Sequence, residues 1–189
     1  MPGMQNIGKI VVAAVAALSL AACGQQAKTQ SAAPAGPSVP SSSAAPAPQS
    51  KGRECTADDV KTTGKFGEVP TITIPDDCDP PKKLITKDLS DGTGDPAKTG
   101  QKLQMNYLLV TWSDKQKLDS SFDRGKPFDL NLGAGEVIPG WDQGLAGIKQ
   151  GARRLLIIPP DLAYGEGGNG MKPNETLVFV TDAVAVGAA

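Results

Sequence analysis

The chain has 189 residues, 39% hydrophobic and only 4% aromatic, and its 19 basic and 20 acidic side chains leave a formal charge of −1. This length suits one ordinary domain with additions, and so balanced a charge gives no overall basic field for nucleic acid. The sequence contains no histidine, which excludes Ser-His-Asp and Cys-His catalysis and histidine-based zinc sites. Cys23, Cys55 and Cys78 form no Cys-x-x-Cys pair, and there is no P-loop or Gly-x-Gly-x-x-Gly fingerprint. We therefore expect no metal and no cofactor.

The N-terminus has the layout of a bacterial export signal. After Lys9, the apolar run Ile10–Leu20 is too short to span a bilayer comfortably and suits the core of a signal peptide. The run ends in Leu20-Ala21-Ala22-Cys23, which resembles the lipobox of bacterial lipoproteins. The resemblance implies that residues 1–22 are a signal peptide, that cleavage precedes Cys23 and that Cys23 carries lipid. An ordinary secretory signal and a stray apolar N-terminus are the alternatives.

The next segment is too polar and too poor in large side chains to fold. Between residues 24 and 53, 18 of 30 residues are Ala, Pro or Ser, and Val39 is the only large aliphatic residue. Such a segment buries too little surface to offset its conformational entropy, and its prolines favour extended backbone. We expect residues 23–53 to be a disordered tether between the lipid anchor and the folded part, on the extracytoplasmic side of the membrane. The alternative is a Pro-rich recognition motif.

Residues 54–82 contain the two remaining cysteines. Outside the cytoplasm, Cys55 and Cys78 most simply form a disulfide, and closing a loop of roughly 20 residues contributes about 3 kcal/mol in the chain-entropy model. Free thiols or an intermolecular bridge are the alternatives. The β-branched run Thr71–Ile74, bounded by two prolines, predicts a short strand. We expect residues 54–82 to pack on the following domain and to add this strand to it.

The C-terminal part predicts many strands and one helix. The strand candidates are alternating or short apolar runs: Lys83–Asp88, Lys102–Val110, Phe128–Leu132, Leu155–Ile158 and Leu177–Val180. Trp141, Leu145 and Ile148 fall at i, i+4 and i+7 and form one apolar helical stripe. Gly144 and Gly147 lie within it and each costs up to about 1 kcal/mol of helix propensity, so the helix should be short. This pattern predicts an α+β domain in which an antiparallel sheet closes over one helix.

Five short stretches of this part follow one another in a recognisable order and spacing. They are Lys117–Ser121, Lys126–Phe128, Glu136–Trp141, Pro159–Gly165 and Thr176–Phe179. Together they resemble the FKBP-type peptidyl-prolyl cis-trans isomerases over about residues 83–187. The resemblance implies an antiparallel sheet half-wrapped around one short α-helix, with residues 83–189 as the isomerase domain.

The resemblance also implies an aromatic pocket between the sheet and the helix. Its catalytic residues would be Asp119, Ile138, Trp141 and Tyr164. Trp141 would form the floor, while the Ile138 N–H and the Tyr164 hydroxyl would bind carbonyl groups of the ligand. Asp119 would be the polar group at the strand edge. The substrate-binding walls would be Tyr107, Leu118, Phe128, Val137 and Phe179.

Two departures from the family pattern concern the rate and the affinity for macrolides more than the fold. Leu118 stands where the family usually has Phe, which should loosen contact near the proline ring. The loop Gly165–Glu175 is about two residues shorter than in the best-known small members, and its four glycines predict a mobile loop. Asp119 also has a structural alternative, as an acid paired with Arg124 or Tyr107.

An aromatic pocket can catalyse rotation about an X-Pro bond without an acid, a base or a metal. Rotation breaks amide resonance, and this barrier is roughly 18–20 kcal/mol. The twisted amide is less polar than the planar one, so a dry aromatic site tolerates it better. A pocket shaped for the twisted form therefore lowers the barrier by differential binding.

The sequence thus predicts a monomeric lipoprotein that isomerises X-Pro bonds and assists the folding of exported proteins. Its expected partners are proline-containing polypeptides, FK506-type macrolides and the membrane that holds the lipid of Cys23, but no nucleic acid. One alternative is a weakly catalytic or non-catalytic FKBP-like module that binds proline-containing segments, which Leu118 favours. Another is a different α+β lipoprotein that binds small ligands.

Overall fold

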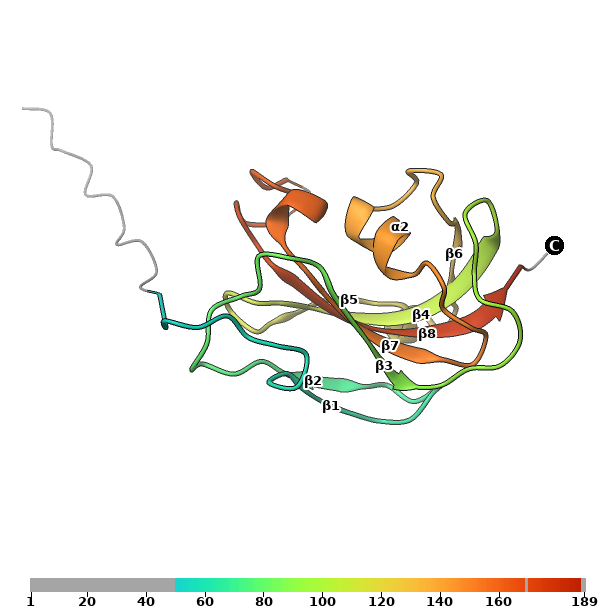
Figure 1. Ribbon diagram of the computed structural model, residues 1–189, viewed down its shortest axis with the longest axis horizontal. Coiled ribbons are helices and arrows are strands. Elements are labelled where there is room, and N and C mark those ends of the chain that lie inside the picture. The colour runs from blue at the N-terminus through green and yellow to red at the C-terminus, as the bar shows by residue number, and fades with distance from the viewer. Residues whose placement is uncertain (1–49, 169, 188–189) are drawn as a thin grey trace, which may run out of the picture. The chain divides into compact units, whose positions relative to one another are not determined.

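Six of the eight strands in the described part of the protein form one antiparallel sheet. The computed structural model describes residues 50–168 and 170–187. The sheet has the order β3-β7-β8-β4-β5, and β6 also pairs with β4. Its strands are β3 (Ile85–Ser90), β4 (Lys102–Thr111), β5 (Lys117–Ser120), β6 (Phe128–Asn131), β7 (Arg153–Ile158) and β8 (Leu177–Val186). The other elements are strands β1 (Lys61–Thr63) and β2 (Thr71–Thr73), helices α1 (Ser121–Arg124) and α2 (Pro139–Gly144), and the 3-10 turn η1 (Pro160–Leu162). This arrangement confirms the predicted α+β class (Figure 1).

Strand β4 holds the sheet together because it pairs with three other strands. One of its edges pairs with β8 over almost its full length. The other edge pairs with β6 as far as Met105 and with β5 from Leu108 onward. Between these two stretches, the Tyr107 N–H donates to the buried hydroxyl of Ser121 at 2.8 Å. The hydroxyl thereby satisfies a backbone donor that the change of partner strand would otherwise leave unpaired.

Both faces of the sheet are covered. Successive side chains of a strand point to opposite faces, so Tyr107 and Leu109 of β4 join one buried cluster while Leu108 and Val110 join another. Strands β7 and β8 divide their apolar side chains in the same way. This two-sided burial explains why these strands read as continuous apolar runs in the sequence.

Helix α2 lies against the face that contains Tyr107 (Figure 1). Two of its glycines allow a close approach to β7: a Cβ on Gly140 would lie 2.3 Å from Ile158, and one on Gly144 would lie 2.9 Å from Leu156. Packing therefore explains the glycines that make this segment a poor helix by propensity. The helix ends at Gly144, before the end of the predicted stripe, although Ile148 beyond it is fully buried.

The segment before β3 covers the opposite face of the sheet (Figure 1). Val60 and Ile74 are 5% and 4% exposed and pack with the outward-facing side chains of β4, β7 and β8. Thr71–Ile74 was predicted to add a strand to the domain. The strand is present, but the predicted pairing with the large sheet was wrong. Residues Thr71–Thr73 form β2, which pairs only with β1 in a separate two-stranded sheet. The hairpin lies across a face of the large sheet, where apolar side chains bind it, and not along an edge.

A buried ion pair attaches this hairpin to the large sheet. The Arg153 guanidinium donates to both carboxylate oxygens of Asp182 at 2.6 and 2.8 Å, and their side chains are 2% and 1% exposed. Both residues also bind the loop between β1 and β2. Arg153 donates to the Glu68 carbonyl at 2.6 Å, and the Gly67 N–H donates to Asp182 at 2.7 Å.

Arg154 points to the other face and ties α2 to the sheet edge. Its guanidinium donates to Asp88 of β3 at 2.5 and 3.0 Å and to the Gly144 and Ala146 carbonyls at the end of α2 at 2.9 and 3.1 Å. Asp88 and Asp182 thus each hold one of two adjacent arginines. The sequence predicts one of these arginines as a charge on the sheet surface and the other as the partner of an acid, whereas the structure buries both and pairs each with an aspartate.

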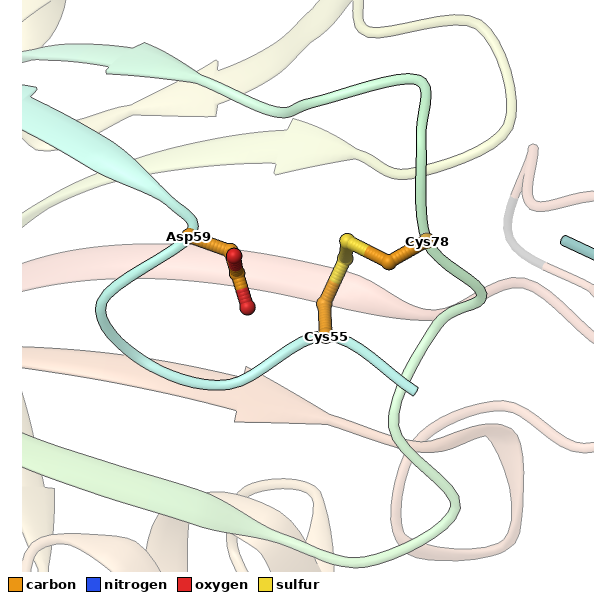
Figure 2. A group of neighbouring side chains, drawn as sticks. All are labelled: Cys55, Asp59 and Cys78. Carbon is orange, nitrogen blue, oxygen red and sulfur yellow. A yellow bond between two sulfur atoms is a disulfide. The ribbon is translucent and has the colours of Figure 1, made fainter. Parts of the chain in front are cut away.

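A disulfide between Cys55 and Cys78 links the two ends of the N-terminal segment 54–82 (Figure 2). Asp59 lies beside it, and the three side chains are close enough to share a metal ion. The two sulfurs, however, are bonded to each other, and Asp59 accepts hydrogen bonds from Arg53 at 3.1 Å and from the Thr56 N–H at 2.8 Å. Cys55, Cys78 and Asp59 therefore stabilise the fold of this segment.

The described chain begins inside the expected tether, at Ser50. The Lys51 N–H donates to both carboxylate oxygens of Asp79 at 2.8 and 3.0 Å, so residues 50–53 belong to the folded part. Cys23 and the expected signal peptide lie outside the described residues. Within residues 50–168 and 170–187, no helix is long and apolar enough to cross a membrane.

Four short elements were absent from the sequence prediction: β1, β5, α1 and η1. Strand β5 has only Leu118 as an apolar residue, and its pairing with β4 makes it a strand. Helix α1 is a single turn, begun by a hydrogen bond from the Phe122 N–H to the Ser120 hydroxyl and ended by Gly125 at φ 65°. Such elements are too short to show a periodic pattern in the sequence.

The Asp182→Asn variant tests the role of the buried pair. It leaves the Arg153 guanidinium buried without its counter-charge, so we expect the free energy of unfolding to fall by about 3–5 kcal/mol. Urea denaturation followed by tryptophan fluorescence measures the change. Asp77→Asn is the matched control, because its ion pair with Arg53 is exposed and should contribute less than about 1 kcal/mol. An equal effect of the two substitutions would contradict the prediction.

Candidate functional site

A cavity of about 250 Å³ lies between the sheet and α2. Its lining comes from β4, β5, β6 and β8, from α2 and the segment that enters it, and from Tyr164, two residues after η1. The lining residues are Tyr107, Leu109, Asp119, Phe128, Glu136, Val137, Ile138, Trp141, Tyr164 and Phe179. Eight of the nine residues expected at this pocket are among them.

Trp141 forms the centre of an aromatic cluster in this cavity. Its ring centroid lies 5.2 Å from that of Tyr107 and 5.4 Å from that of Phe179, with interplanar angles of 89° and 73°. Phe128 completes the cluster at 6.0 Å and 85°. These are edge-to-face contacts, which place the positive edge of one ring against the negative face of another. The rings support one another, so the apolar walls keep their shape without a ligand.

Leu118 is the expected pocket residue that the structure places elsewhere. Its neighbour Asp119 faces the cavity, and because adjacent residues of a strand face opposite sides, Leu118 is directed away and is 43% exposed. Sequence analysis missed Leu109 and Glu136 as lining residues. Leu109 shares the face of Tyr107 two positions earlier, so strand alternation was a sufficient signal for it. For Glu136, the only signal in the sequence was its position in the matched stretch, directly before Val137.

A ring of hydrogen bonds makes the polar edge of the pocket. The Tyr107 hydroxyl donates to the Asp119 carboxylate, and the Arg124 guanidinium donates to the same carboxylate and, at 2.7 Å, to the Tyr107 oxygen. The guanidinium carbon also lies 5.4 Å from the centre of the Tyr107 ring. The Ser120 N–H donates to Asp119 at 2.7 Å. Asp119 therefore both lines the site and is the structural partner of Tyr107 and Arg124.

These contacts determine the charge at the edge. Partial burial alone would raise the pKa of Asp119, but hydrogen bonds from Tyr107 and Arg124 outweigh it and hold the pKa below its usual value. Burial and the hydrogen bond to the Asp119 carboxylate raise the pKa of Tyr107. Near neutral pH, Asp119 is thus an anion and Tyr107 a neutral phenol. The pair offers an acceptor and a fixed field, and neither group is poised to exchange a proton.

Ile138 presents a backbone donor beside the aromatic floor. It is the N-cap residue of α2, with φ −59° and ψ 146°, and its carbonyl accepts from the Trp141 N–H at 2.9 Å. Pro139 follows at the first helical position, where its missing N–H removes no helical hydrogen bond. Among the residues described, no acceptor takes the Ile138 N–H. This donor is therefore available to a carbonyl group in the pocket.

Tyr164 lines the cavity from the end of a tight turn. It follows η1, and its carbonyl accepts from the Gly167 N–H at 2.9 Å, while the Gly165 N–H donates to the Pro160 carbonyl at 2.9 Å. These bonds hold the residue by its backbone. Its hydroxyl makes no side-chain hydrogen bond within residues 50–168 and 170–187, so it too is free to bind a ligand.

Comparison with known proteins agrees with this geometry. Residues 94–183 match the family model of the FKBP-type peptidyl-prolyl cis-trans isomerases. The chain is 47% identical over 122 residues to an FK506-binding protein of Streptomyces anulatus, a match that covers 63% of this chain and 98% of that protein. It is 40% identical over 106 residues to the FK506-binding protein of Neisseria meningitidis serogroup B, covering 54% and 95% respectively.

Two solved structures share the fold. The crystal structure of AtFKBP13 is 35% identical, with a TM-score of 0.51, over 54% of this chain and 91% of that one. The crystal structure of FkpA from Escherichia coli is 38% identical, with the same TM-score of 0.51, over 56% of this chain and 49% of that one. The fold and its aromatic pocket thus define a rotamase. The chain belongs to the FKBP-type peptidyl-prolyl cis-trans isomerases.

The lowered pKa of Asp119 predicts how activity depends on pH. The carboxylate stays ionised down to its folded-state pKa, which lies below the usual value for an aspartate. Any contribution of the carboxylate to activity or stability is therefore complete above about pH 5 and is lost only as the pH falls through that pKa. We expect kcat/KM to be constant from pH 5 to pH 8, measured by NMR exchange at an X-Pro bond. A kinetic pKa within this range would show that another group titrates in the reaction.

Proposed function

We propose that this isomerase acts on exported polypeptides at the extracytoplasmic face of the membrane, where a lipid on Cys23 anchors it. The apolar run, the small residues and the cysteine stand in the order of a lipoprotein signal. The buried disulfide Cys55–Cys78 supports an oxidising compartment, because such bonds persist outside the cytoplasm. In this setting, newly exported chains refold, and slow X-Pro isomerisation can limit their folding.

One observation carries the proposed mechanism: the Ile138 N–H and the Tyr164 hydroxyl have no acceptor within residues 50–168 and 170–187, and both residues line an aromatic cavity whose Asp119 and Tyr107 are not poised to exchange a proton. We propose that the proline ring of the substrate enters the cavity above Trp141. The Ile138 N–H then binds a carbonyl of the chain and fixes its direction. The Tyr164 hydroxyl holds a second carbonyl while the amide turns. Because both donors are fixed before the substrate arrives, little reorganisation is required at the transition state.

The apolar walls contribute by favouring the twisted amide over the planar one. Amide resonance separates charge between oxygen and nitrogen, and rotation removes this separation. Tyr107, Phe128, Val137 and Phe179 exclude water, so the planar form loses more solvation than the twisted form on entering. Only such a difference in binding accelerates the step. Asp119, held as an anion by Arg124, supplies an acceptor and a negative field at one edge of the rotating bond.

A binding module with slow turnover is the second candidate, and the position of Leu118 favours it. Leu118 is 43% exposed and does not line the cavity, so the rim lacks an apolar wall on the β5 side. A proline could then bind in the cavity while the residue before it remains poorly restrained. Poor restraint of this residue would weaken the preference for the twisted form.

Turnover with and without a macrolide decides between these candidates. We expect the purified protein to accelerate cis–trans exchange in an Ala-Leu-Pro-Phe peptide and to lose this activity when FK506 is added. Tyr164→Phe removes one donor and should lower kcat/KM about tenfold, which corresponds to about 1.4 kcal/mol. Phe66→Leu, on the exposed loop between β1 and β2, is the control and should have no effect. If turnover is near zero while titration with the peptide still changes the tryptophan fluorescence, the natural protein is chiefly a binder.

Membrane attachment has its own test. We expect the full chain, expressed in a bacterium that processes lipoproteins, to incorporate labelled palmitate and to sediment with membranes. Cys23→Ser should abolish both, because its thiol is the point at which the proposed lipid attaches. Cys55→Ser with Cys78→Ser is the control that should keep the label. Labelling that survives Cys23→Ser would refute the lipid anchor at this position.

A further inference from the structure

The segment between β6 and α2 is held in place by a carboxylate outside the pocket. Asp142 lies in the first turn of α2, directly after Trp141. Its carboxylate accepts from the Gly133 N–H at 2.8 Å and from the Gly135 N–H at 3.1 Å. Its own N–H is 3.4 Å from the Ile138 carbonyl. Asp142 therefore binds both the Gly133–Gly135 turn, which leads into the pocket wall, and Ile138, whose N–H is the proposed substrate-binding donor.

A second carboxylate closes the same segment into a ring. Glu136 accepts from the Asn131 N–H at 3.0 Å and from the Asn131 side-chain amide at 2.8 Å. These bonds from Asn131 lower the pKa of Glu136. Glu136 lines the cavity, whereas Asp142 does not, so only Asp142 can act on the wall without touching the substrate. The turn between Asn131 and Val137 is thus held by the Asp142 carboxylate at its glycines and by the Glu136 carboxylate at Asn131.

Packing cannot replace these hydrogen bonds. Residues 133–136 are all exposed, and Gly133 and Gly135 have φ values of 75° and 71°, in the left-handed region that favours glycine. A Cβ on Gly135 would meet nothing within 4 Å, whereas one on Gly133 would lie 2.6 Å from the Thr99 side chain, so packing restrains only the start of the turn. Two glycines in an exposed turn have high conformational entropy, which the Asp142 carboxylate must offset.

We propose that Asp142 is a positioning residue for the isomerase reaction. By fixing the Gly133–Gly135 turn, it keeps Val137 at the wall and the Ile138 N–H aimed into the cavity before the substrate binds. The inference rests on the proposed role of the Ile138 N–H. A donor that is already in place binds its carbonyl without an ordering penalty, so loosening the turn weakens substrate binding. The aromatic walls that favour the twisted amide are unchanged.

Asp142→Asn is the direct test because it preserves size. A carboxylate offers acceptors to both N–H groups, whereas an amide offers one acceptor and turns an NH₂ group toward the other donor. We expect KM for the Ala-Leu-Pro-Phe peptide to rise five- to tenfold and kcat to stay within twofold, the pattern of lost uniform binding. The Gly133 and Gly135 amides should exchange with solvent faster. Asp58→Asn, an exposed acid on the opposite side of the sheet, is the matched control and should change neither constant.

Circular dichroism and thermal unfolding establish that each variant is folded at the assay temperature. If Asp142→Asn does not fold, Asp142→Glu retains a carboxylate on a longer arm and should raise KM less than fivefold with the same constant kcat. Faster exchange of Gly133 and Gly135 with an unchanged KM overturns the proposal. So does a fall in kcat with an unchanged KM.

A separate measurement distinguishes failure of this proposal from failure of the proposed function. If the wild-type protein shows no turnover, the enzymatic mechanism fails, but peptide binding can still be titrated by Trp141 fluorescence. In that case, the positioning role predicts that Asp142→Asn raises the dissociation constant of the peptide five- to tenfold. An unchanged dissociation constant refutes the role of Asp142 independently of catalysis.

Discussion

The structure depends on one constraint: the central strand β4 must pair with three strands while burying side chains on both of its faces. It pairs with β8 from Leu103 to Thr111 with one shift of register, but its other edge passes from β6 to β5 within a few residues. That passage falls at Tyr107, a wall of the pocket, and the buried Ser121 hydroxyl completes the hydrogen bonding there. The place where the sheet changes partner is therefore also the place where it opens a cavity.

Two-sided burial makes the N-terminal segment part of the domain. The family match begins at residue 94, yet the outer side chains of β4, β7 and β8 are covered by Val60, Ile74 and the disulfide. The buried Arg153–Asp182 pair extends this contact into the β1–β2 loop through two backbone groups. An isolated buried charge is strongly unfavourable, so the pair also fixes the position at which the hairpin must dock. The hairpin thus supports strand β8, which supplies Phe179 to the pocket.

The site combines a neutral interior with a charged edge, and each part requires the other. The aromatic cluster around Trp141 excludes water, which strengthens any electrostatic effect at its rim. The Arg124 guanidinium keeps Asp119 charged and at the same time uses the Tyr107 oxygen as an acceptor. The Ile138 N–H and the Tyr164 hydroxyl, which have no acceptor in the described part of the chain, are the donors that the proposed mechanism assigns to the peptide. On the far side of Ile138, Asp142 and Glu136 hold the turn that would otherwise be free.

The sequence by itself determined the fold class and the strand-forming runs, because alternation and short apolar runs are local patterns. Its resemblance to the FKBP family named nine pocket residues, and eight of them line the cavity. Only the tertiary structure decided how the parts meet. Hairpin β1–β2 lies across a face and not at an edge, Leu118 faces away from the cavity, and Arg153 and Arg154 are buried on opposite sides. Each of these outcomes depends on contacts between residues far apart in the chain, which no local periodicity records.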